Sequence, residues 1–180
     1  MAKLRFSFNS EKFVNAVAYL AEQCPNSTKM SICKQLFYAD KEHLTRFGRP
    51  IVGDHYYRLD HGPVPTKGLN ILRNRASGAE QALLEKYVSI AGHSIDPKQP
   101  ADKKVFSKTD LAVLDEIVQK YGNLSAAQLR HKTHSESAWI NSESNCPIDY
   151  ELFFEDGDTE MMALAKEEQE SRDLLRPYSR

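Results

Sequence analysis

Two histidines and two aspartates gather between residues 54 and 61, and their side chains are of the types that ligate metal ions. His55 and His61 lie six residues apart, and Asp54 and Asp60 directly precede them. Imidazole nitrogens and carboxylate oxygens bind zinc and other divalent ions. The sequence has no His-Glu-x-x-His motif or other helical ligand pair. We therefore expect hydrogen-bonded histidines that stabilise a turn, no metal and no cofactor, with a metal-dependent enzyme as an alternative.

A second group of ring side chains lies further along the chain. His131 and His134 are three residues apart, a spacing that places both on one face of a helix, and Trp139 follows. We expect structural roles here, with His134 capping a helix end and Trp139 filling the core.

Motifs for nucleophilic or phosphate chemistry are missing from the sequence. It contains no Gly-x-Ser-x-Gly elbow, no Gly-x-x-x-x-Gly-Lys loop and no Gly-x-Gly-x-x-Gly fingerprint. Cys24, Cys33 and Cys146 are odd in number and widely spaced, which predicts buried thiols instead of disulfides or a zinc site. Cys33 lies on the apolar side of a predicted helix, which favours burial over reactivity. The residues therefore do not predict an enzyme.

Two helices at the start of the chain must position these residues. The first begins after Asn9-Ser10, which are favourable capping residues, and ends before Pro25. The second is predicted over Lys29–Phe47, with Gly48 just beyond its end. Its apolar residues share one face, and Lys34 is expected on the polar side.

The chain becomes extended after the second helix. Ile51–Leu59 contains β-branched and aromatic residues around Gly53-Asp54, which predicts a strand–turn–strand or an extended loop. Residues 60–65 include Gly62 and two prolines, and predict a tight, conformationally restricted corner. Weaker alternation over residues 87–96 indicates a further pair of short strands.

Helices dominate the remainder of the chain. Ser107 and Asp110 have the spacing of a capping box at the start of a helix that reaches Tyr121. A short helix follows Ser125, and a last helix is predicted after Asp158, docked on the body by Met161, Leu164, Ala165 and Leu175. We therefore expect a mainly α fold, a single compact helical domain with a small β-hairpin or extended element after the second helix.

Composition and charge exclude several classes of protein. The chain of 180 residues carries 24 Lys and Arg against 25 Asp and Glu, and this near-neutral balance makes nucleic acid an improbable partner. Its longest apolar run has six residues, too short to span a membrane, and we expect a cytoplasmic protein. Residues 155–180 hold eight acidic and four basic side chains, so this end could mask a basic partner surface.

Three stretches, taken together, resemble a known family. They are Lys34-Gln35-Leu36-Phe37-Tyr38-Ala39-Asp40-Lys41-Glu42-His43-Leu44, then Gly53-Asp54-His55-Tyr56 leading to His61-Gly62-Pro63-Val64-Pro65, and finally Phe106–Gly122 with Leu124-Ser125-Ala126 and His134–Trp139. Their order and spacing resemble the Panacea domain, the family of SocA-like antitoxins and phage-associated GepA-like proteins. The similarity covers about residues 10–155. We expect residues 1–155 to form the Panacea-like domain and residues 156–180 an acidic helix that is packed on the domain or appended to it.

The resemblance implies a helical domain from bacterial or phage toxin–antitoxin pairs, whose members neutralise toxins by direct binding. It therefore implies an antitoxin with a cognate toxin as partner and no catalysis. One branch of the family hands its toxin to the ClpXP protease, so a proteolytic adaptor is the first alternative. A DNA-binding autorepressor, using a short helix over 125–133 after the helix over 107–121, is a further alternative.

The resemblance also selects candidate site residues as the core of the motif or its partner-binding surface. They are Tyr38, Asp40, His43, Asp54, Tyr56, His61, Gly62, Pro63, His134 and Trp139. We expect Asp40 and His43 to face both the turn that contains Asp54 and the corner at Gly62-Pro63.

Overall fold

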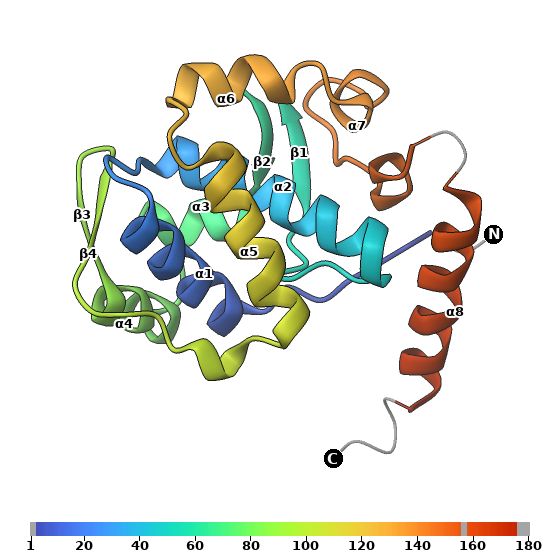
Figure 1. Ribbon diagram of the computed structural model, residues 1–180, viewed down its shortest axis with the longest axis horizontal. Helices are drawn as coiled ribbons and strands as arrows, with labels where there is room; N and C mark the ends of the chain where they lie inside the picture. Colours follow the sequence, from blue (N-terminus) through green and yellow to red (C-terminus); the bar gives the residue numbers. More distant parts are fainter. Residues whose placement is uncertain (1–2, 156–157, 176–180) are drawn as a thin grey trace.

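The computed structural model describes residues 3–155 and 158–175, and in it helices surround one central helix (Figure 1). In chain order the elements are α1 (Ser10–Gln23), α2 (Lys29–Phe47), β1 (Tyr56–Leu59), β2 (Gly62–Pro65), α3 (Thr66–Leu72), α4 (Gly78–Tyr87), β3 (Val88–Ala91), β4 (Ser94–Pro97), η1 (Lys103–Val105), α5 (Lys108–Tyr121), α6 (Ala126–Thr133), α7 (Ser137–Ile140), η2 (Tyr150–Phe153) and α8 (Thr159–Leu175).

The expectation of a mainly helical fold is confirmed, since only two short hairpins accompany the helices over the described residues. Apolar side chains from both hairpins and most helices form one continuous core. Phe37 is fully buried, with its ring edge-on to Tyr56 and Phe153 at centroid distances of 5.5 and 5.2 Å. Within the described ranges, no helix is both long enough and apolar enough to cross a membrane.

Helix α2 is the central element of the fold. It packs on α1, α3, α5, α6, α8 and β2, and every residue from Ser31 to Asp40 is buried. Thr28 forms a capping box at its start, and Gly48, with φ of 74°, ends it. A helix covered on all sides buries its polar residues too. Lys34, expected on a polar face, is therefore fully buried.

Capping side chains define the starts of α1 and α5 as the sequence predicts. The side chain of Asn9 accepts a hydrogen bond from the backbone of Lys12 at 2.9 Å. Ser107 and Asp110 form the expected capping box at the start of α5. These interactions link residues only three positions apart, so they could be read directly from the sequence.

The first hairpin differs from the expected one in the position of its turn. Strands β1 and β2 are antiparallel, Leu59 lies opposite Gly62, and Asp60-His61 forms the turn. Of the two alternatives for residues 51–59, the strand–turn–strand with a turn at Gly53-Asp54 is wrong, because these residues precede β1 in an extended segment that wraps against α2. The segment over residues 60–65, expected to be a tight corner, contains this turn and strand β2. The second expected strand pair is confirmed as β3 and β4.

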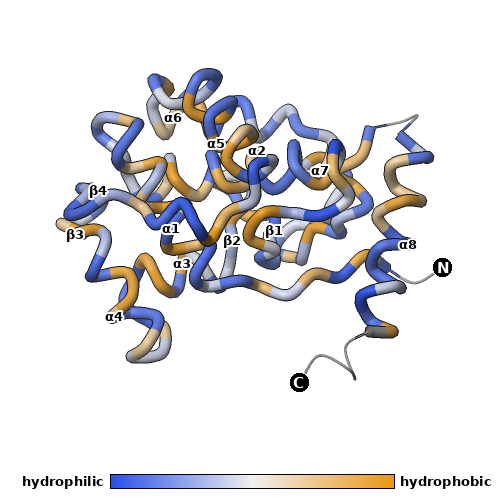
Figure 2. The backbone as a smooth tube through the Cα atoms, turned by 60° about the horizontal axis from the view of Figure 1, so that its bottom comes forward, coloured by the Kyte–Doolittle hydropathy of each residue, from blue (hydrophilic) through white to orange (hydrophobic). Residues whose placement is uncertain are grey.

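Helix α8 lies at the edge of the molecule, beside the N-terminal segment (Figure 1). An apolar stretch over residues 161–165 is followed by a hydrophilic stretch over residues 166–173 (Figure 2). Ala165 is buried next to Gly48, and the side chain of Gln169 hydrogen-bonds to the backbone of Lys3 and Arg5. The expected docking by Leu164 is wrong, because this side chain is 44% exposed.

The expected roles of some C-terminal residues are not tested by this structure. The side chain of Leu175 lies outside the described residues, as do residues 156 and 157, where the appended helix was expected to begin. The division into residues 1–155 and 156–180 stays a prediction.

Candidate functional site

The carboxylate of Asp40 organises the segment between α2 and β1. It accepts hydrogen bonds from the backbone N–H groups of Ile51 and Val52, both at 2.8 Å, and of Gly53 at 3.1 Å. The hydroxyl of Tyr56 donates a fourth bond at 3.0 Å. Burial raises the pKa of Asp40 to about 6, and the four donors oppose this effect. Asp40 therefore faces the segment that leads to Asp54, as expected, whereas none of these four bonds reaches the corner at Gly62-Pro63. Its bonding capacity is used within the fold.

The carboxylate of Asp54 caps helix α3. It accepts hydrogen bonds from the backbone of His55 at 2.7 Å, Lys67 at 3.1 Å and Gly68 at 2.6 Å. The hydroxyl of Tyr150 donates to the carbonyl oxygen of the same residue at 2.6 Å. Burial raises the pKa of Asp54, against the lowering effect of these backbone donors. This side chain therefore fixes the start of α3 relative to β1.

The side chain of His43 points toward the start of α5 and not toward the first hairpin. Its Nδ1 atom lies 2.7 Å from the carbonyl oxygen of Arg49, and its Nε2 atom lies 3.0 Å from both Thr109 Oγ1 and Asp110 Oδ1. The expectation that His43 faces Gly62-Pro63 is therefore wrong. It lies almost one turn beyond Asp40, about 4.5 Å further along α2, and that shift brings it against the start of α5.

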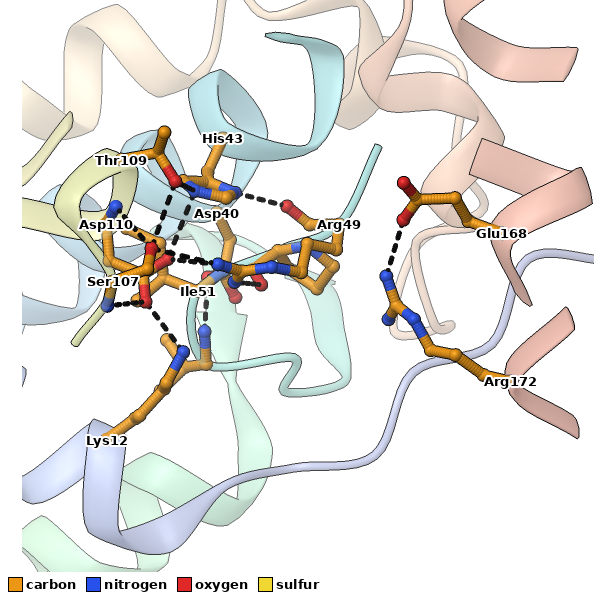
Figure 3. Close-up of polar contacts among 12 residues, drawn as sticks. Lys12, Asp40, His43, Arg49, Ile51, Ser107, Thr109, Asp110, Glu168 and Arg172 are labelled. Atoms are coloured by element: carbon orange, nitrogen blue, oxygen red, sulfur yellow. Dashed lines mark hydrogen bonds and ion pairs between the residues drawn. The ribbon is translucent and has the colours of Figure 1, made fainter. Parts of the chain in front are cut away.

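Asp110 joins three helices through a buried charge cluster (Figure 3). Its fully buried carboxylate lies 2.6 Å from Lys12 Nζ and 2.9 Å from Arg49 Nη2. Burial would raise the pKa of Asp110, but hydrogen bonds from His43 and Lys12 and the charge of Arg49 hold it well below its usual range.

Lys12 and Arg49 also line a cleft of about 500 Å³. Arg172, which pairs with Glu168, lies on the far side of this cleft (Figure 3).

A buried lysine connects α2 to the hairpin. Lys34 Nζ donates to the carbonyl oxygen of Pro63 at 2.8 Å. Burial lowers the pKa of Lys34 to about 8, and the nearby charge of Arg130 adds to this effect. Gly62 has φ of 93°, and a Cβ atom on it would lie 2.5 Å from Thr133 Oγ1 and 3.0 Å from Lys34 Nζ. The helical periodicity of the sequence predicted a polar, exposed position for Lys34, although this residue is the first of the motif over 34–44.

The remaining residues singled out on α2 are also interior. Tyr38 is buried and stacks on Tyr121, with ring centroids 4.4 Å apart. Cys33 is buried as expected, and burial raises the pKa of its thiol to about 12. Cys24 is buried too, whereas Cys146 is partly exposed, so the expectation of buried thiols is wrong for that residue.

Trp139 lies at the surface of the hairpin and not in the core as expected. Its indole N–H donates to the carbonyl oxygen of Leu59 at 3.1 Å, which keeps the half-buried ring beside the end of β1. The ring stacks on His134 at 4.3 Å, and the guanidinium of Arg58 lies 4.4 Å from its centroid. His134 is the C-terminal cap of α6, as expected. His61 is exposed in the adjacent turn.

The hairpin separates the histidines of the metal alternative. His55 precedes β1 and His61 follows it, so the four-residue strand places them roughly 13 Å apart. The carboxylate of Asp54 is turned inward to cap α3. Over residues 3–155 and 158–175, no group of three or more His, Cys, Asp or Glu side chains is placed to hold a metal ion.

The structure divides the ten candidate residues into two sets. The interior set is Tyr38, Asp40, His43, Asp54, Tyr56, Gly62 and Pro63. The other three lie around the β1–β2 turn on a surface that we call the tip face, formed by Arg58, Asp60, His61, Arg130, His134, Trp139 and the exposed Ile140 that follows it. Arg58 and Arg130 were missed because an arginine in a strand or a short helix carries no distinctive local pattern.

Comparison with known families places this geometry in context. A family model described as antitoxin SocA-like, Panacea domain, matches residues 32–140. The match begins within α2, ends with α7 and is narrower than the expected residues 10–155. It includes both the interior set and the tip face. No curated protein and no solved structure matches the chain. Because the family model covers more than half of the sequence, this chain belongs to the SocA-like antitoxin family that the Panacea domain defines.

Proposed function

We propose that this protein is the antitoxin of a toxin–antitoxin pair and neutralises its cognate toxin by direct binding. The observation that carries the proposal is the family match, which spans the central helix, the first hairpin and helices α5 to α7. A toxin is the partner that membership of an antitoxin family suggests.

The interior set supports a scaffold for binding. Asp40 and Asp54 direct their carboxylates at backbone N–H groups of neighbouring segments, and His43 bonds to the start of α5. These side chains fix the positions of α2, α3, α5 and β1. They leave contact with a partner to exposed residues, which can vary without loss of the fold.

The same bonding pattern supports a function without catalysis. A general acid or base must reach a substrate proton, and the buried carboxylates of Asp40 and Asp54 are bonded to the protein's own backbone. Cys33 is a poor nucleophile, because burial raises the pKa of its thiol to about 12. In the proposed mechanism, the folded domain covers the working surface of the toxin.

Co-expression with the product of the adjacent reading frame tests the proposal. We expect that product to stop growth when expressed alone, and growth to return when this chain is co-expressed. The two proteins should then co-purify in a near-stoichiometric complex. A neighbouring product that is harmless, or rescue of growth without a complex, would contradict direct neutralisation.

A host without ClpX separates the adaptor from direct inhibition. An inhibitor that works by binding restores growth equally with and without the protease, and the amount of toxin stays constant. An adaptor restores growth only where ClpX is present, and the toxin disappears there. Immunoblots of the toxin in both hosts, read beside the growth curves, decide between these two mechanisms.

A further inference from the structure

The cations beside the β1–β2 turn donate to backbone carbonyl oxygens. Arg58 donates to the carbonyl oxygen of Ser142, Arg130 to that of Asp60 and Lys34 to that of Pro63. Over residues 3–155 and 158–175, none of these three cations forms an ion pair with a carboxylate. Asp60 contributes the one carboxylate of the tip face, so positive charge exceeds negative charge there.

The buried position of Lys34 strengthens this positive charge. Its ammonium group is fully buried beneath Gly62, where the low dielectric screens its field less than water would. The pKa of the His134 imidazole responds to the same charges. Burial lowers this pKa most, and the positive charges of Arg130 and Lys34 lower it further. An anionic group at the tip face would meet a positive potential that is already in place.

Apolar and aromatic groups lie beside these charges. Trp139 is half-buried between Arg58 and His134, and Ile140, the next residue, is 53% exposed. Tryptophan and arginine are enriched among the residues that contribute most to protein–protein binding. Figure 1 shows that the end of β1 and the start of β2 lie beside α6 and α7.

We propose that the tip face is the toxin-binding surface and that it receives an acidic patch of the toxin, with Trp139 and Ile140 as apolar contacts and Arg58 and Arg130 as charge partners. This inference rests on the proposed function and adds to it a location and a partner chemistry. Charge complementarity then fixes the orientation of the complex and speeds its formation.

A protein surface fits the tip face better than nucleic acid does. Affinity for a nucleic acid backbone comes from many cations along a groove or stripe. The tip face offers two exposed or half-exposed arginines, the carboxylate of Asp60, and a tryptophan fixed by its own hydrogen bond. This mixture of a few charges and a large apolar ring is typical of a protein interface.

Site-specific photo-crosslinking in the full chain tests the location. Benzoylphenylalanine is placed at His61 or Ile140 and, as a control, at the exposed Lys104 in η1, which packs on α1 away from the hairpin. The probe is the co-expressed product of the adjacent reading frame. We expect crosslinks from the two tip positions and none from the control. A complex that crosslinks only at Lys104 would overturn the tip face while leaving direct binding intact.

Charge reversal in the same complex tests the partner chemistry. We expect Arg130→Glu to weaken binding at least tenfold by calorimetry, and Lys104→Glu to change it less than twofold. Arg130→Gln, which removes the charge without reversing it, should give an intermediate loss, and thermal melting checks that each variant is folded. Equal affinities for Arg130→Glu and wild type would overturn the acidic patch.

Two other experimental results would lead to different conclusions. If no complex forms with wild-type protein, the proposed function fails, and the toxin-binding surface fails with it. If the tip positions crosslink to duplex DNA from the promoter of this gene, and Arg130→Glu abolishes the crosslink, the tip face is a nucleic-acid surface and the inference of an acidic protein partner is overturned.

Discussion

Lys34 Nζ lies 2.8 Å from the carbonyl oxygen of Pro63, so the central helix and the first hairpin are joined through a buried charge. A buried ammonium without a carboxylate partner is costly, and the protein responds with a lowered pKa. The contact holds β2 against α2, directly beneath the tip face. The packing of the first hairpin on α2 therefore depends on a charged side chain.

Lys34 makes stability depend on pH in the alkaline range. The unfolded chain keeps this proton up to about pH 10.5, whereas the folded protein releases it above about pH 8. The unfolded state binds more protons between these values, so the free energy of unfolding should rise with pH in this window. Relative to Lys34→Met, wild type should gain about 2 kcal/mol between pH 7.5 and pH 10.

Urea unfolding of both proteins at several pH values checks this prediction. Tyrosines and the other cysteines and lysines titrate in wild type and variant alike, so the difference between the two curves isolates Lys34. Parallel curves would show that the folded protein does not perturb this ammonium group.

Asp40→Asn should destabilise the protein strongly although it preserves the shape of the side chain. All four partners of Asp40 are donors, and an amide group would direct its own N–H atoms at some of them. We expect a loss of about 3 kcal/mol in the free energy of unfolding. Asp60→Asn is the matched control, because Asp60 is exposed, and should change stability by less than about 0.5 kcal/mol. Equal losses in the two variants would remove the scaffold role of Asp40.

Neighbouring residues of the turn should respond in opposite ways to alanine. Gly62→Ala places a Cβ atom 2.5 Å from Thr133 Oγ1 at a φ of 93°, so we expect a loss of about 2 kcal/mol or more. His61→Ala removes an exposed ring and should leave stability within about 0.5 kcal/mol. Chemical denaturation gives both values, and a folded His61→Ala that no longer binds the toxin would place this residue in the interface. Unfolding of His61→Ala would instead assign it to the scaffold.

Local interactions explain which features could be predicted from the sequence. Asn9 and Ser107 cap helices through neighbours three residues away, and Gly48 ends α2 through its own left-handed backbone. Each depends on a few adjacent residues, so spacing and residue type suffice. The family resemblance added long-range information, since it selected Asp40, Asp54 and Tyr56 before any contact among them was known.

Features that depend on tertiary packing could not be predicted in this way. Lys34 has the spacing of a solvated residue, but β2 and α6 cover the face of α2 from which it projects. Trp139 has the composition of a core residue, but its indole N–H binds the carbonyl oxygen of Leu59 at the surface. Asp110 was recognised as a cap, and its contacts with Lys12 and Arg49 arise only when distant segments meet.

A variant of helix α8 can distinguish two candidate toxin contacts, the acidic end of the chain and the tip face. Glu160, Glu167 and Glu170 are exposed on this helix. If the acidic end masks a basic toxin surface, replacing all three with glutamine should weaken binding and flatten its dependence on salt. If the toxin presents an acidic patch to the tip face, the same variant should bind as tightly as wild type or more tightly, because repulsion is removed. We expect the second result, measured by calorimetry at 50 and 300 mM salt; a clear loss of affinity would move the contact to α8.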